Sequence, residues 1–91
     1  MKQKRIAKTV LVQGMTVKAR VMVEHESGLV MRDRVAKVIR IEARSAEFAG
    51  KVVTQYIAIL GDRFGKTHEF DLTHSLWVKN KKKKWVRRRG V

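Results

Sequence analysis

The stretch MTVKARVMVE at residues 15–24 constrains the fold of this chain most strongly, because every second position is apolar and, apart from Met22, the positions between are polar or charged. These apolar residues are Met15, Val17, Ala19, Val21 and Val23. Successive side chains of a β-strand point to opposite faces of its sheet, so a period of two is typical of a strand with one buried face. We therefore predict a strand at 15–24, with Lys18 and Arg20 on its outward face.

Two further segments have strong strand character. KVVTQYIAIL, residues 51–60, is an apolar run rich in β-branched residues, and a glycine bounds it on each side. KTHEFDL, residues 66–72, alternates again, so that Phe70 and Leu72 point inward. β-Branched and aromatic residues are enriched in strands, whereas glycine marks the turns between them. We predict a strand in each segment, joined by a turn at GDRFG, residues 61–65.

Shorter stretches complete the folded part. TVLV, residues 9–12, is a short apolar run that a Gln-Gly pair separates from the next segment, and we predict a short strand there. HESG, residues 25–28, has the composition of a turn. Trp77 and Val78 form the last apolar pair before the basic tail, so we expect the folded domain to end at Val78.

Residues 30–49 support two interpretations, since neither glycine nor proline interrupts them. Val35 and Ile39 begin a series of apolar residues at helical spacing, which favours one helix at about 30–49. Apolar and charged residues also alternate over 39–44, and the segment is rich in β-branched residues, which favours a strand. We favour a strand over roughly 34–44 and keep the helix as the alternative.

About five short strands in a domain of this size predict a mostly β fold. The expected architecture is a small five-stranded barrel-like or strongly bent antiparallel sheet, with flexible basic arms at the N- and C-termini. If residues 30–49 are helical instead, the fold is α+β.

The strand segments resemble a known family of small barrels. MTVKARV, RVAKVIRIEA and VVTQYIAILGDRFGKTHEFDL, which span roughly residues 14–73, are similar to barrels of the Src-homology-3 type, particularly the Tudor and KOW groups. The similarity lies in an A-K-V-type strand, a D-x-x-G turn and a short E-x-x-L strand. SAEFAG, residues 45–50, is a longer hairpin connection than these barrels have. The resemblance implies binding of nucleic acid or of modified peptide tails, and fold alone does not decide between them.

The positive charge is concentrated at the two ends of the chain. The formal net charge is +14, from 22 Lys and Arg against 8 Asp and Glu. Residues 1–8 carry +4 and residues 79–91 carry +8, whereas residues 9–78 carry only +2. We therefore divide the chain into a basic N-terminal arm at 1–8, a single small domain at 9–78 and a basic C-terminal tail at 79–91. Such an excess indicates a polyanionic partner, since Lys and Arg displace the counterions condensed on phosphates.

The candidate nucleic-acid contacts lie in the two arms and on the outward face of two predicted strands. In the tail they are Lys79, Lys81, Lys82, Lys83, Lys84, Trp85, Arg87, Arg88 and Arg89. In the N-terminal arm they are Lys2, Lys4 and Arg5, and on the strands they are Lys18, Arg20, Arg40 and Arg44. Lysine binds phosphate as a point charge, arginine also forks onto it, and an exposed indole stacks on a base.

Each of these interpretations has a plainer alternative. The tail would also serve as solvated, disordered chain that keeps the protein soluble, and Trp85 would then pack back onto the domain. On the strands, Glu24 and Glu42 interrupt the basic ribbon, so ordinary cross-strand charge pairing is the alternative there.

The sequence predicts no catalytic residue, no metal site and no cofactor. The chain has no cysteine, which removes thiolate metal sites and cysteine nucleophiles. His68 and His74 would lie about 20 Å apart along a strand, too far to share a metal ion. GDRFG has two glycines but lacks the spacing of a phosphate-binding loop. We expect a protein that is not an enzyme.

The expected function is binding of nucleic acid, DNA rather than RNA, through phosphates and with little sequence preference. Such a protein would suit a bacterial or phage nucleoid-modulating or regulatory role, in the cytoplasm or on the nucleoid, or in the nucleus of a eukaryote. Two alternatives stay open: a small interaction protein that binds a host protein complex, and a ribosome- or RNA-associated protein of the KOW kind. No apolar run approaches the roughly 18 residues of a membrane span. A polybasic tail is drawn to anionic lipid, but this tail lacks the second hydrophobic anchor that stable attachment needs, so we expect no membrane partner.

Overall fold

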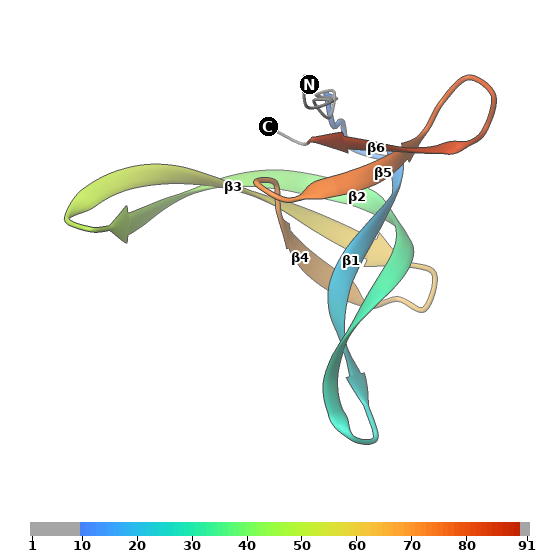
Figure 1. The fold of residues 1–91 in the computed structure, drawn as a ribbon, viewed down its shortest axis with the longest axis horizontal. Helices are drawn as coiled ribbons and strands as arrows, with labels where there is room; N and C mark the ends of the chain where they lie inside the picture. Colours follow the sequence, from blue (N-terminus) through green and yellow to red (C-terminus); the bar gives the residue numbers. More distant parts are fainter. Residues whose placement is uncertain (1–9, 90–91) are drawn as a thin grey trace, which may run out of the picture.

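The computed structural model describes residues 10–89, which form one antiparallel sheet of six strands. The strands are β1 (Thr16–His25), β2 (Gly28–Phe48), β3 (Lys51–Asp62), β4 (Thr67–Asp71), β5 (Ser75–Lys79) and β6 (Trp85–Arg89). Their order across the sheet is β4-β3-β2-β1-β5-β6 (Figure 1). The mostly β fold expected from the sequence is therefore confirmed. Among these residues no helix has the length and apolar character to cross a membrane.

The long strand β2 decides between the two interpretations of residues 30–49. It runs over 21 residues, so the segment is a strand and the alternative helix is wrong. β2 pairs with β1 through residues 28–37 and with β3 through residues 36–48. A segment rich in β-branched residues thus finds a hydrogen-bonding neighbour along its whole length, which outweighs its helical spacing.

An irregularity in β2 shifts its register against β3. Val38 lies opposite Leu60 and Arg40 lies opposite Ile59, so Ile39 is an extra, bulged residue. Val38 and Leu60 are fully buried in the core. Ile39 Cδ1 lies 2.9 Å from the position that a Cβ on Gly61 would occupy, so a larger residue at position 61 would require the Ile39 side chain to move.

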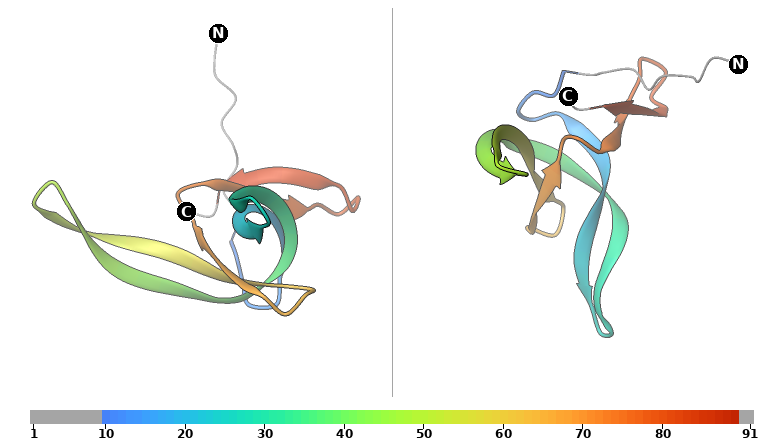
Figure 2. Two further views of the ribbon diagram at one scale, coloured as in Figure 1. Left: turned by 90° about the horizontal axis from the view of Figure 1, so that it is seen from below. Right: turned by 60° about the vertical axis from the view of Figure 1, so that its left-hand side comes forward.

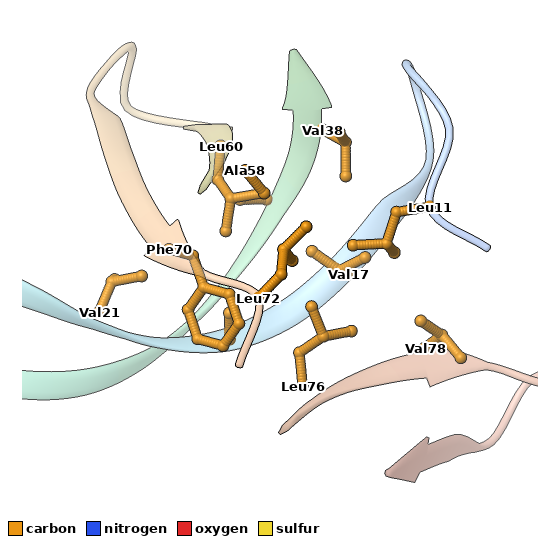
Figure 3. Close-up of a cluster of buried hydrophobic side chains, with 12 residues drawn as sticks. Leu11, Val17, Val21, Val38, Ala58, Leu60, Phe70, Leu72, Leu76 and Val78 are labelled. Carbon is orange, nitrogen blue, oxygen red and sulfur yellow. The ribbon is translucent and has the colours of Figure 1, made fainter. Parts of the chain in front are cut away.

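The core lies on the inner face of a strongly curled sheet (Figure 3). It contains Leu11, Val17, Ala19, Val21, Ala36, Val38, Ala58, Leu60, Phe70, Leu72, Leu76 and Val78. The predicted inward positions of the strand at 15–24 and of the strand at 66–72 agree with this burial. Residues 10–12 are not a strand, in contrast to the prediction for TVLV; Leu11 instead packs into the core from a connecting segment.

The sheet curls but does not close into a barrel. Among residues 10–89, β4 pairs only with β3, and it approaches β1 to within 8 Å between Cα atoms. The sequence predicts a five-stranded barrel-like or strongly bent antiparallel sheet, and the structure has an open, curled antiparallel sheet of six strands instead of a closed barrel of five (Figure 1). The β1–β2 and β2–β3 hairpins project from its curled part as two-stranded ribbons (Figure 2).

The turn at 62–66 is held by one carboxylate. Asp62 Oδ1 accepts hydrogen bonds from the backbone N–H of Phe64 and of Lys66, at 2.8 and 3.0 Å. Asp62 Oδ2 lies 2.7 Å from Nε2 of His68, and both side chains are buried. The His68 contact and these backbone donors hold the pKa of Asp62 below its ordinary value of 3.8.

Residues 79–89 differ most from the sequence prediction. The sequence predicts a flexible arm here. In the structure, residues 79–89 instead belong to a hairpin, because β6 pairs with β5 along its full length. Asn80 Oδ1 accepts hydrogen bonds from the N–H groups of Lys82 and Lys84, at 2.9 and 3.0 Å, and thereby organises the turn. Val86 packs against the core, which ties the hairpin to the domain. The N-terminal arm at 1–8 lies outside the described residues.

Candidate nucleic-acid interface

The strand register gathers aromatic and basic side chains on one outer face of β1, β5 and β6. Lys18 lies opposite Trp77, Trp77 lies opposite Arg87, and Lys79 lies opposite Trp85. Residues that face each other across antiparallel strands point to the same side of the sheet. We define the C-terminal basic face as Lys18, Arg20, Trp77, Lys79, Trp85, Arg87 and Arg89. None of these seven positions is acidic.

The two indoles are interleaved with lysine ammonium groups. Lys18 Nζ lies 5.3 Å from the ring centroid of Trp77 and 5.4 Å from that of Trp85. Lys79 Nζ lies 5.3 Å from the ring of Trp85. A cation at this distance is attracted to the π-face of an indole. Trp85 is half-buried and packs back onto the domain beside Lys18. It remains part of a positively charged surface.

Arg87 and Arg88 point to opposite sides of β6. Arg87 lies on the C-terminal basic face, where its Nε donates a hydrogen bond of 2.6 Å to Ser75 Oγ. Arg88 lies opposite Leu76, on the side of the core, and is half-buried. The structure thus separates Arg88 from the other two arginines of the tail. The four lysines at 81–84 are exposed in the hairpin turn.

Arg40 and Arg44 belong to a different surface, where acidic groups neutralise them. Arg40 Nε donates to Glu42 Oε1 at 2.7 Å, and Arg44 donates to Glu42 Oε2 at 2.6 Å. Arg44 also pairs with Glu69 on β4. Hydrogen bonds from Arg44 and then Arg40 hold the pKa of Glu42 below its ordinary value of 4.5. We call these four residues the β2–β4 charge cluster.

This charge cluster is separated from the C-terminal basic face by the register of β2. Arg40 and Arg44 lie on the part of β2 that pairs only with β3, whereas β1 pairs with residues 28–37. Lys18 and Arg20 therefore do not lie next to Arg40 and Arg44. Within residues 10–89, these four residues do not form one continuous basic ribbon. The pair of Arg44 with Glu69 joins two strands, as the alternative from the sequence expected, whereas Glu42 pairs with both arginines from within β2.

A groove of about 750 Å³ adjoins the C-terminal basic face, between β1 and β4. Val21 and Phe70 line its apolar side. Arg20, Arg87 and Arg89 line it together with Trp77 from the C-terminal basic face. It is the part of the surface where basic, aromatic and apolar groups meet.

The histidines are not arranged as metal ligands. His68 contacts Asp62, and the ring of His74 lies 6.4 Å from that of Phe70 in an edge-on orientation. Within residues 10–89, no group of three or more His, Cys, Asp or Glu side chains could hold a metal ion.

Sequence reasoning placed Lys18, Arg20, Lys79, Trp85, Arg87 and Arg89 among the candidates but missed Trp77. Trp77 was assigned only to the end of the folded part. The alternation within LWVK is a weak strand signal that places Trp77 and Lys79 on one side of their strand. That Trp85 lies on the same side follows only from the register of β5 with β6. Lys2, Lys4 and Arg5 lie outside the described residues. No family model, no curated protein and no solved structure matches this chain.

Proposed function

We propose that this protein is a non-enzymatic nucleic-acid-binding protein that holds phosphates on its C-terminal basic face. The observation that carries the proposal is the register of β1, β5 and β6, which sets five cations and two indoles side by side. Asp33 on β2 lies opposite Arg20 at the border of this face, and no ion pair joins the two within residues 10–89. Such a surface favours binding of a polyanion, because each lysine or arginine that contacts a phosphate releases a condensed counterion.

The β-hairpin improves on a disordered tail in one physical respect. A flexible tail loses conformational entropy when it settles on a phosphate backbone, whereas strand pairing has already fixed Lys79 and Arg87. The exposed lysines at 81–84 extend the positive surface beyond the sheet. Contacts of this kind position the protein on a phosphate backbone and carry no sequence information, so sequence preference is low.

The family resemblance is part of this proposal. A curled sheet with the A-K-V strand and the D-x-x-G turn supports a relation to small barrels of the Tudor and KOW kind, in an open form. We propose DNA before RNA as the partner, and a bacterial or phage nucleoid-modulating or regulatory role in the cytoplasm or on the nucleoid. The alternative is an RNA- or ribosome-associated role of the KOW kind, in which the same C-terminal basic face would bind RNA.

The test is a salt titration of binding to a labelled DNA duplex by the full chain and two substituted chains. The first carries Lys18→Gln, Lys79→Gln and Arg87→Gln on the C-terminal basic face. The second carries Arg40→Gln and Arg44→Gln in the β2–β4 charge cluster. Substitution is preferred to truncation at Val78, because truncation removes β6 and uncovers the core beside Val86.

We expect the triple substitution to flatten the log–log salt slope by about three phosphates, at roughly 0.9 per phosphate. The double substitution should leave the slope within about one phosphate of the full chain, because both arginines already have carboxylate partners. Equal slopes for all three chains would contradict the assignment of the binding face.

A protein-interaction role is a second candidate, favoured by one observation. The β2–β3 ribbon exposes Phe48, Val52, Val53 and Tyr56 without a covering element. A full chain that binds neither duplex DNA nor structured RNA at low salt would favour this role over the first.

A further inference from the structure

The open sheet leaves a seam between β1 and β4. β5 pairs with β1 only at Val17 and Lys18, so among residues 10–89 the edge of β1 beyond Lys18 has no strand beside it on that side. β4 is the end strand of the sheet, and its outer edge faces β1 across the core. The groove of about 750 Å³ opens along this seam.

The groove combines an apolar side with an arginine-rich side. Val21 and Phe70, each at most 5% exposed, line it from β1 and β4. Trp77 lines it from β5, and the exposed Met22 and Met31 line it from the β1–β2 ribbon. Arg20, Arg87 and Arg89 supply three guanidinium groups. The lining thus offers apolar surface for a flat ring beside donors for an anion.

The two carboxylates of the groove have partners of their own. Asp71 accepts hydrogen bonds from Gln55 Nε2 at 2.8 Å and from the N–H of Thr73 at 2.9 Å. Glu69 pairs with Arg44. In contrast, Arg20 and Arg89 make no ion pair within residues 10–89, and Arg87 donates to a neutral hydroxyl. Asp33 lies opposite Arg20 on β2 without forming an ion pair with it. An anionic ligand therefore meets arginines that form no ion pair and groove carboxylates that already have donors.

We propose that this groove binds an unpaired nucleotide, with its base against Trp77 and the apolar side and its phosphate on Arg20, Arg87 and Arg89. This inference rests on the proposed function and adds the form of nucleic acid: single-stranded rather than duplex. A groove of this volume lies within the usual range for small-ligand sites, about 300–1,000 Å³. It does not suit an added peptide strand, since β1 and β4 approach within 8 Å and an inserted strand needs about 9.5 Å between its neighbours.

The preference for single strands follows from where the bases are in each partner. In a duplex the bases are stacked and paired, so a base enters a side groove only after it is flipped out of the helix. In a single strand each base is free to stack on an aromatic side chain, a contact that raises affinity by about tenfold. The phosphate contacts are shared by both forms, so the groove alone distinguishes them.

The experiment compares a labelled oligothymidylate of about ten nucleotides with a blunt duplex of equal phosphate number, at matched salt. The full chain is tested beside His74→Glu, which sets a carboxylate in the groove at a position that is not one of the seven residues of the C-terminal basic face. Thr54→Glu is the matched control, because it makes the same change of charge at an exposed position of the β2–β3 ribbon. Tryptophan fluorescence is followed in Trp77→Phe and Trp85→Phe.

We expect the full chain to bind the single strand about tenfold more tightly than the duplex. His74→Glu should remove this preference, whereas Thr54→Glu should keep it. Quenching by the oligothymidylate should be lost in Trp77→Phe and kept in Trp85→Phe. Equal affinity of the full chain for both forms, or an equal weakening of both by His74→Glu, would overturn the inference while leaving the proposed function intact. Failure of the full chain to bind either form would overturn the proposed function itself.

Discussion

Two regions of this molecule carry outward-facing arginine, and they differ in what stands next to it. On the C-terminal basic face, Arg87 has Ser75 and Trp77 as its nearest partners across the strand pair. In the β2–β4 charge cluster, Glu42 lies between Arg40 and Arg44 and hydrogen bonds to both. The first region leaves its positive charge available to an external anion, and the second satisfies it internally.

The difference indicates that a carboxylate two positions away on the same strand, rather than the count of cations along the chain, decides which arginines are paired within the protein. The charge cluster also has a structural role, because it lies over the buried side chains of Ile57 and Ile59 on the outer side of β3. Long arginine side chains commonly cover apolar surface with their stems while keeping the charged head in water.

The largest expected effect comes from introducing a carboxylate on the C-terminal basic face, as Glu42 provides in the β2–β4 charge cluster. Ser75→Glu sets a carboxylate opposite Arg89 and beside Arg87. We expect the affinity for nucleic acid to fall about tenfold to a hundredfold at low salt, with the salt slope reduced by about two phosphates. Fluorescence anisotropy measures both quantities. Thr54→Glu is again the control of equal charge, and an equal loss in both variants would mean that net charge rather than local pairing sets the affinity.

The reverse change is expected to have a smaller effect. Glu42→Gln releases Arg40 and Arg44 from their shared carboxylate, so the cluster becomes able to hold phosphate. The salt slope should steepen by about one phosphate, since Arg44 keeps its pair with Glu69. The midpoint of thermal unfolding should fall at neutral pH, because the three hydrogen bonds from Arg40 and Arg44 lose their charged acceptor. A variant with unchanged slope and unchanged melting would show that the cluster does not restrain its arginines.

The smallest expected effect is on the pH dependence of stability. Glu42 has a folded-state pKa below its ordinary value of 4.5, so its pairing stabilises the fold fully above about pH 4.5. This stabilisation is lost as the pH falls through the lowered folded-state pKa, because protonation then ends the attraction to the arginines. The pKa of Asp62 is also lowered, from its ordinary value of 3.8, so its stabilising contacts are likewise lost as the pH falls through its folded-state pKa.

Urea unfolding at a series of pH values from about 6 to about 3 measures this dependence. The slope of stability against pH should be shallower in Glu42→Gln than in the full chain. An unchanged slope in that variant would assign the acid sensitivity to Asp62 and other carboxylates instead.

The regular strands could be predicted from the sequence because the local pattern of apolar and polar residues in each one matches which of its side chains are buried. Val17, Ala19 and Val21 alternate with polar residues, and the structure buries them as the pattern predicts. β3 is apolar and β-branched where it crosses the core, and its positions 57–60 are buried. In these segments, local pattern and tertiary packing agree.

The C-terminal hairpin could not be predicted in the same way. WVRRR contains one inward apolar residue, Val86, so its period-two signal is weak beside eight positive charges. Its strand conformation depends on pairing with β5, which itself depends on two residues of β1. The position of Trp77 beside Lys18 follows from that long-range register, which no local pattern encodes. The same limit applies to Arg44, whose partner Glu69 is on β4.

The pairing of β1 with β5 also has a consequence for how the chain folds. Every other strand pair among residues 10–89 joins neighbours in sequence, whereas Lys18 and Trp77 are separated by about 60 residues. Closing so long a loop costs entropy that only two residue pairs and the core beneath them offset. The hairpins of β1 to β4 form from local contacts, and we expect the β5–β6 hairpin to dock last. On a ribosome, the C-terminal basic face would then be completed only after the tunnel has released the final strand.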